Sequence, residues 1–160
     1  MIRAYVALGA NLGHPAATVR AALAALSGIP EATLVAASSL YRTAPLGLKH
    51  QPDFINAVAA VDTTLAPLAL LEALFAIEAR FGRSRSVKNA PRTLDLDLLL
   101  YGESRLDEVR LTLPHPRMHE RAFVLVPLAE LAPECRIPGR AALSELLALC
   151  RDQGVVRLEP

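Results

Sequence analysis

An alternating run near the middle of the chain constrains the fold more than any other feature. From Thr93 onward, leucines at 94, 96, 98 and 100 alternate with Thr93, Asp95, Asp97 and Leu99. A period of two is typical of a β-strand, here with one face of leucine and another face that carries two carboxylates. Asp95 and Asp97 then point the same way, with Cα atoms about 6.5–7 Å apart. The chain therefore needs a sheet with one covered face and a second face that accommodates paired acid.

The paired carboxylates indicate a cation site. Two like charges on one strand face repel each other unless a cation lies between them, or each binds one of a close pair of ions. Oxygen ligands suit Mg²⁺, which keeps several waters and is usually completed by substrate phosphates.

The residues just before this strand are strongly basic. Between positions 79 and 94 the chain has five basic residues and no acid: Arg80, Arg83, Arg85, Lys88 and Arg92. Gly82, Asn89 and Pro91 break helix and strand alike, so most of this run is expected in a loop. Beside paired carboxylates, it indicates a site for a polyphosphate bridged by metal. The alternative is a solvated charge run next to an exposed strand face.

Hydrophobic patterns place the elements in the order β-α-β-β-α-β, in which the acidic strand is the last. We expect strands over 2–8, 33–42 and 54–62, and helices over 17–26 and 67–81, the second capped by Thr64. A turn over 9–13, a loop over 43–52, a hairpin-like stretch over 102–113 and two helices over 123–131 and 143–149 complete the chain. This order predicts an α+β fold in a single domain, 1–160. We expect a ferredoxin-like split βαβ sandwich, an antiparallel sheet with helices on one face and C-terminal helical additions. Asp95 and Asp97 are expected on the other face.

Side chains outside the acidic strand also suit ligand binding. Glu78 falls in the middle of the apolar stripe of its helix, so it either has a partner or binds something, unless it reaches solvent at the helix end. Phe54 and Asn56 share a strand face, where a ring and an amide can hold a flat heterocycle. A core phenylalanine and a strand-edge asparagine are the simpler explanation of that pair. His115, between two prolines and near two arginines in sequence, suits a phosphate, although a lone histidine is more often structural.

Composition and charge exclude other classes. The formal net charge of +1 gives no general attraction to nucleic acid or membrane. No apolar run approaches the ~18–20 residues that span a bilayer. The first residues lead directly into a strand pattern without the regions of a signal peptide, and two cysteines are too few for a disulfide framework. The turn over 9–13 matches neither glycine-rich nucleotide motif. We therefore expect a cytoplasmic protein, a monomer, with small-molecule partners only.

Several segments together resemble the family of 6-hydroxymethyl-7,8-dihydropterin pyrophosphokinases. Residues 88–99, KNAPRTLDLDLL, are similar to the family signature. Further likeness lies in 7–13 (ALGANLG), 41–47 (YRTAPLG), 51–57 (QPDFINA) and 113–118 (LPHPRM), so that it covers nearly the whole chain. The resemblance implies transfer of pyrophosphate from ATP to the 6-hydroxymethyl group of the dihydropterin. The products would be AMP and the pterin diphosphate, in folate biosynthesis, with two Mg²⁺ ions and with ATP as co-substrate.

The resemblance also implies roles for residues at matching positions. Asp95 and Asp97 would bind the metal, and the catalytic set would be Arg83, Arg85, Arg92, Asp95 and Asp97. ATP would be bound by Glu78, Arg83, Arg85, Arg92, Leu98, Arg110, Thr112, His115 and Arg121. The pterin would be bound by Thr43, Pro45, Leu46, Phe54, Asn56, Asp95 and Phe123, stacked between the two rings. The chain departs from the family at Phe54, where Tyr is common, and at Asn89-Ala90, where many relatives have Trp.

Two other functions remain open on the sequence. A phosphohydrolase or nucleotidyltransferase on the same kind of sheet would share the aspartates and arginines, but would have no use for Phe54, Asn56 and Phe123. A ligand- or RNA-binding module would stack bases on sheet aromatics within a basic surface. Aromatic residues make up 4% of this chain, and two aspartates on the sheet would repel phosphate in the absence of metal.

Overall fold

The computed structural model describes residues 1–44, 52–82 and 93–159. Its first half contains β1 (Ile2–Ala10), α1 (Pro15–Leu26), β2 (Ala32–Ala37), β3 (Tyr41–Thr43), β4 (Phe54–Thr63) and α2 (Pro67–Arg80). The second half contains β5 (Asp95–Tyr101), β6 (Leu106–Asp107), β7 (Thr112–Leu113), the 3-10 helix η1 (Met118–Glu120), α3 (Ala122–Leu131), α4 (Leu143–Leu149) and β8 (Val155–Arg157). No helix among these residues is long and apolar enough to cross a membrane.

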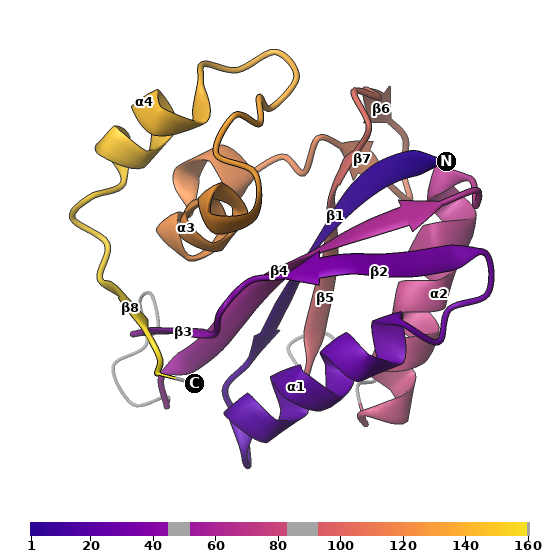
Figure 1. Ribbon diagram of the computed structural model, residues 1–160, viewed down its shortest axis with the longest axis horizontal. Coiled ribbons are helices and arrows are strands. Elements are labelled where there is room, and N and C mark those ends of the chain that lie inside the picture. Colours follow the sequence, from indigo (N-terminus) through magenta and orange to yellow (C-terminus); the bar gives the residue numbers. More distant parts are fainter. Residues whose placement is uncertain (45–51, 83–92, 160) are drawn as a thin grey trace.

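A six-stranded antiparallel sheet organises the molecule. The strand order is β5-β1-β4-β3-β8, and β2 pairs with the part of β4 that β3 leaves free. α1, which follows β1, and α2, which follows β4, lie on one side of the sheet (Figure 1). The predicted α+β arrangement, with an antiparallel sheet and helices on one face, is confirmed.

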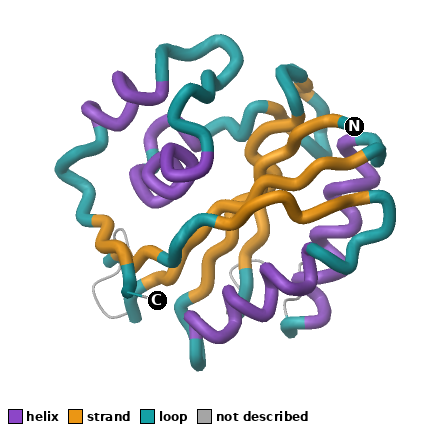
Figure 2. The backbone as a smooth tube through the Cα atoms, viewed as in Figure 1, coloured by secondary structure: helices purple, strands orange, loops and turns teal. Residues whose placement is uncertain are grey.

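Each face of the sheet has its own hydrophobic core. Leu94, Leu96 and Leu98 pack with α1 and α2 in the first core. Val58 and Leu99 belong to a second core that α3 and α4 cover on the opposite side (Figures 1 and 2). The sequence predicted these C-terminal helices without placing them. α3 and α4 cover part of the sheet face that carries Asp95 and Asp97, and so form a wall beside the uncovered part of that face.

The strand predicted over 33–42 is wrong in one respect, because the chain forms two strands there. The Ser38 hydroxyl accepts a hydrogen bond from the Val58 amide (2.9 Å), and the Ser38 amide donates to the Val58 carbonyl (2.9 Å). The Ser39 amide turns away and donates to the Glu130 carboxylate on α3 (2.9 Å). A side-chain hydroxyl thus replaces a backbone partner, and the strand breaks between β2 and β3.

The alternation that predicted β5 holds only as far as Leu98. The pairing of β1 with β5 shifts register between Tyr5 and Val6, which face Leu100 and Leu98. Leu99 and Leu100 therefore both enter the second core, whereas Leu100 was expected with the other even-numbered leucines. A bulge inserts one extra residue in one strand and reverses the side-chain phase beyond it.

Several expected element ends differ from the structure by one or two residues, as at α1, which begins at Pro15 and not at residue 17. Gly9 and Ala10 belong to β1 rather than to a turn. The N-cap of α2 is Ala66, which makes no side-chain hydrogen bond, so Thr64 is not the cap. The hydroxyl that acts near this end is that of Thr63, which accepts from the Leu65 amide (2.9 Å).

Candidate active site

The two aspartates open β5 on the face opposite the leucines. Asp95 is paired with Gly9 and Asp97 with Ala7 of β1, and both acidic residues are half-buried. The start of this strand is fixed to the end of α2, because the Thr93 hydroxyl donates to the Phe81 carbonyl. The predicted orientation of the aspartate pair is consistent with this register.

His115 lies within electrostatic reach of both Asp97 and Arg121. Burial lowers the pKa of His115; Asp97 raises it, while Arg121 and Arg117 lower it, and the result is a pKa below the usual histidine value. The His115 amide donates to the Leu99 carbonyl (2.9 Å), which anchors this loop to β5. The structure thus brings together an acid, an imidazole and a guanidinium that the sequence had placed far apart along the chain.

The protonation of His115 follows from its contacts. Its Nδ1 accepts a hydrogen bond from the Arg117 amide (3.2 Å), so a neutral ring carries its proton on Nε2. Such a ring donates a hydrogen bond to an anionic oxygen without being charged. The lowered pKa is therefore compatible with a phosphate contact.

We expect His115 to be a neutral Nε2–H tautomer at pH 7.5. Long-range ¹H–¹⁵N correlation spectra of uniformly labelled protein distinguish the two neutral tautomers and the imidazolium directly, and the His115→Gln variant assigns the signal. A charged ring, or a proton on Nδ1, would contradict the assignment.

A second group of residues lies across the sheet from Asp95. The register aligns Tyr41 of β3 with Asn56, Asn56 with Gly9, and Gly9 with Asp95. Asn56 donates through Nδ2 to the Thr43 hydroxyl (2.9 Å), and both side chains are buried. A Cβ on Gly9 would lie 2.9 Å from Asn56 Oδ1, closer than such atoms approach in proteins. The absence of a side chain at Gly9 therefore leaves room for the Asn56 side-chain amide in the position from which it donates to Thr43.

The two predicted stacking rings lie on different elements. Phe54 opens β4 and shares its strand face with Asn56, while Phe123 lies in the first turn of α3 and packs against the second core. The Arg121 guanidinium carbon lies 5.6 Å from the centre of the Phe123 ring, within cation–π range. Arg121 thus links the ring of α3 to the Asp97–His115 group.

Glu78 and the Leu98 side chain lie on the face of β5 opposite to Asp95 and Asp97. Glu78 is 1% exposed and accepts a hydrogen bond from the Leu96 amide (2.7 Å), at the outer edge of the sheet. This gives its carboxylate a structural partner. The Leu98 side chain is buried in the first core, so a ligand contact of this residue would have to use its backbone. Leu98 is two residues from Leu96 and presents its backbone to the same edge.

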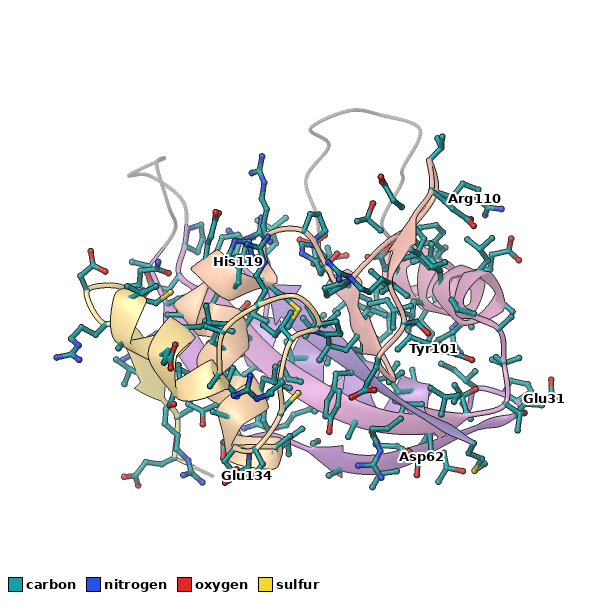
Figure 3. The ribbon with its side chains drawn as sticks, turned by 90° about the horizontal axis from the view of Figure 1, so that it is seen from above. Glu31, Asp62, Tyr101, Arg110, His119 and Glu134 are labelled. Carbon is teal, nitrogen blue, oxygen red and sulfur yellow. The ribbon has the colours of Figure 1, made fainter. Side chains whose placement is uncertain are left out.

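Arg110 and Thr112 lie at the small β6–β7 hairpin. Arg110 is exposed and pairs with Glu72 of α2 (3.0 Å), so a phosphate would compete with this surface ion pair, which is the weaker kind. Figure 3 shows Arg110 beside α2, on the opposite side of the molecule from Asp62. Thr112 is half-buried in β7. The predicted site residues Pro45, Leu46, Arg83, Arg85 and Arg92 lie outside the described residues.

The donor set at Asp95 and Asp97 fits a hard divalent cation. Among the described residues, no three His, Cys, Asp or Glu side chains gather in a way that could hold a metal. Two carboxylates alone suit Mg²⁺, which is commonly bound by one or two carboxylates and completed by water and phosphate. The pair therefore matches a metal that arrives with its nucleotide better than a resident structural ion.

A family model matches the residues that make up this geometry. The model of 7,8-dihydro-6-hydroxymethylpterin-pyrophosphokinase (HPPK) matches residues 5–133, which include the described site residues from Thr43 to Phe123. The chain belongs to this family. The HPPK match ends near the close of α3, so α4 and β8 lie beyond it.

Curated HPPK relatives cover the full length of the chain. A 2-amino-4-hydroxy-6-hydroxymethyldihydropteridine pyrophosphokinase of Pseudomonas aeruginosa is 56% identical over 156 residues, 98% of this chain and 96% of the relative. The protein of the same name from Haemophilus influenzae is 46% identical over 160 residues, the whole of both chains.

Solved structures show the same fold in longer chains. A crystal structure described as HPPK-DHPS in complex with substrates has a TM-score of 0.73 at 13% identity and covers 92% of this chain. The wild-type HPPK-DHPS of Plasmodium falciparum gives 0.72 at 14% identity. This chain spans 43% and 40% of those two chains, and at such identity the likeness concerns the fold alone.

Sequence reasoning missed three residues that shape this candidate site. Gly9 was assigned to a turn, although a glycine next to a strand pattern can signal a close approach of another group. Glu130 on α3 accepts hydrogen bonds from the Ser39 amide and the Tyr41 hydroxyl, and so joins this helix to β3. Gln153 accepts a hydrogen bond from the Ala122 amide at the start of α3. No local pattern in the sequence indicates the contacts of Glu130 or of Gln153.

Proposed function

We propose that the protein transfers pyrophosphate from ATP to the 6-hydroxymethyl group of 6-hydroxymethyl-7,8-dihydropterin. AMP would leave, and the pterin diphosphate would continue into folate biosynthesis. One observation carries the proposal: Asp95 and Asp97 share a sheet face with the buried Asn56–Thr43 pair, which lies across β1 from Asp95, and His115 lies within electrostatic reach of both Asp97 and Arg121. A polyphosphate and a polar heterocycle would then lie on either side of the aspartates.

The cationic side suits the nucleotide. Arg121 offers a planar set of donors for phosphate oxygens, and His115 offers its Nε2–H from a rigid loop. Asp95 and Asp97 would hold Mg²⁺, which when bound would neutralise phosphate charge and lower the pKa of the attacking hydroxyl. The predicted roles of Arg83, Arg85 and Arg92 in neutralising charge on the transferred group belong to the same proposal. So do the predicted ATP contacts of Glu78, Leu98, Arg110 and Thr112, and the number of two metal ions.

The amide side suits the pterin. Because Asn56 is held by Thr43, its carbonyl oxygen has a fixed direction and can accept hydrogen bonds from an amino-pyrimidine edge. Phe54 and Phe123 supply the flat apolar faces against which such a ring stacks. Pro45 and Leu46 would complete this side.

The buried Asn56–Thr43 pair argues against the rival enzymes. A phosphohydrolase or nucleotidyltransferase would use the aspartates and Arg121, but would gain nothing from this pair next to them.

The two cysteines are unbridged, which fits the reducing cytoplasm. We place the enzyme there, as a monomer that acts on small molecules.

Product analysis by ³¹P NMR tests the proposal. The protein is mixed with ATP, Mg²⁺ and 6-hydroxymethyl-7,8-dihydropterin, and AMP with a pterin diphosphate is expected. ADP with inorganic phosphate would contradict transfer from the β-phosphorus and favour a hydrolase on the same aspartates. Unchanged ATP with retained pterin binding would favour a binding module. Omitting the pterin is the control, because water alone should then give little AMP.

A further inference from the structure

The chain beyond the family match returns to the site. After α4, residues 150–158 run back to the sheet, where β8 pairs with β3 as its outer neighbour (Figures 1 and 2). Val155 lies opposite Thr43, and Arg157 lies opposite Tyr41. This C-terminal segment therefore supports the strand that carries the hydroxyl partner of Asn56.

Gln153 connects the same segment to the start of α3. Its Oε1 accepts a hydrogen bond from the Ala122 amide (3.0 Å), and its Nε2 donates to the Glu120 carbonyl (2.9 Å). The Gln153 amide donates to the Cys150 carbonyl (3.0 Å), so the side chain projects from a fixed turn. One side chain thus holds the peptide groups on both sides of Arg121.

The two bonds matter because of where they fall. The Ala122 amide is among the first in α3, and such amides have no partner within their own helix. Arg121 precedes the helix in an extended conformation (φ −116°, ψ 107°), with Phe123 just inside the first turn. Figure 3 shows His119 of η1 and Glu134, which follows α3, well apart on this side of the molecule.

We propose that Gln153 is a positioning residue that fixes the backbone at Arg121 and Phe123, and so sets both the nucleotide side and the pterin side of the site. The proposal rests on the proposed function. Two residues later, Val155 holds Thr43. This short stretch of chain therefore contacts both the Phe123 wall and the Asn56–Thr43 wall, between which a ring would lie, at the end of α3 opposite to the Glu130 contacts. Loss of Gln153 leaves both walls present and still joined by the Glu130 contacts, but removes the bonds that hold the start of α3 at Arg121 and Phe123.

The test measures the two ligands separately in the full-length protein. Isothermal titration calorimetry with 6-hydroxymethylpterin, and with a non-hydrolysable Mg·ATP analogue, is carried out on wild type, Gln153→Ala and Gln153→Glu. The glutamate keeps the acceptor for Ala122 but loses the donor to Glu120. We expect both dissociation constants to rise about 3- to 10-fold in either variant, as for the loss of one or two hydrogen bonds. The exposed neighbour Arg151→Ala is the matched control and should leave both constants unchanged.

Mutant cycles separate positioning from simple destabilisation. If Gln153 acts through Phe123, Gln153→Ala should not weaken pterin binding further in a Phe123→Ala background. The effect on the nucleotide analogue should likewise disappear with Arg121→Ala. Additive effects in both backgrounds, or a lower melting temperature with unchanged dissociation constants, would overturn the proposal. Wild type that binds neither ligand would instead reject the proposed function.

Discussion

Replacement of Asp97 by asparagine should reduce turnover on the order of 10³-fold or more, while the fold remains intact. Asparagine has the size of aspartate but lacks the charge that would hold a cation against the phosphates. Asp97 also lies within electrostatic reach of His115, so the substitution removes an anion that faces this ring. Because the side chain is half-buried and lies near the start of the edge strand β5, we expect no change in circular dichroism or in the melting temperature beyond a few degrees.

The measurement is steady-state AMP formation over a range of Mg²⁺ concentrations. Asp62→Asn is the control, since it makes the same change on the same sheet, at the opposite end of β1 from Asp95. Asp62 pairs with Arg3 at the surface, where an ion pair contributes little. The control should keep wild-type activity. Asp97→Asn with full, Mg²⁺-dependent turnover would remove the acidic pair from the mechanism.

The fold and the acidic face were predictable because both depend on local patterns. Alternation from Thr93 to Leu98 fixes which side chains share a face, and the order of elements then leaves few antiparallel arrangements. The bulge at Leu99 was not predictable, because leucine on either side satisfies a hydrophobic pattern equally well. Its position becomes meaningful only when α3 and α4 supply a second core.

The contacts that shape the site were out of reach for a different reason. Gln153 lies 31 residues from Ala122, and Glu130 lies 91 residues from Ser39. Neither pair has a sequence signal, since each is a polar side chain meeting a backbone group that only the fold exposes. The chemistry-bearing residues form motifs, whereas the residues that hold them in place do not.

Gly9 gives the second large effect that we expect. Gly9→Ala should weaken binding of 6-hydroxymethylpterin about 10- to 100-fold, because the new methyl group would lie 2.9 Å from Asn56 Oδ1. Asn56 must then move, and its bond to the Thr43 hydroxyl, which fixes the direction of the amide, is lost or lengthened. Affinity for a non-hydrolysable Mg·ATP analogue should stay within about threefold, since the atoms within 4 Å of the new methyl group belong to Asn56 and Ile55.

Calorimetric titration of each ligand measures the two affinities. Gly28→Ala is the matched control: its new methyl group would meet the Ala25 carbonyl oxygen at 3.5 Å, an ordinary contact, at the end of α1. Pterin affinity equal to wild type in Gly9→Ala would show that the Asn56 amide does not read the heterocycle. If Gly9→Ala weakens pterin binding but not nucleotide binding, the lack of a side chain at this position of β1 is required for pterin binding. In that case Gly9 is required by the ligand and not by the strand, since β1 pairs on both sides at this position without needing a glycine.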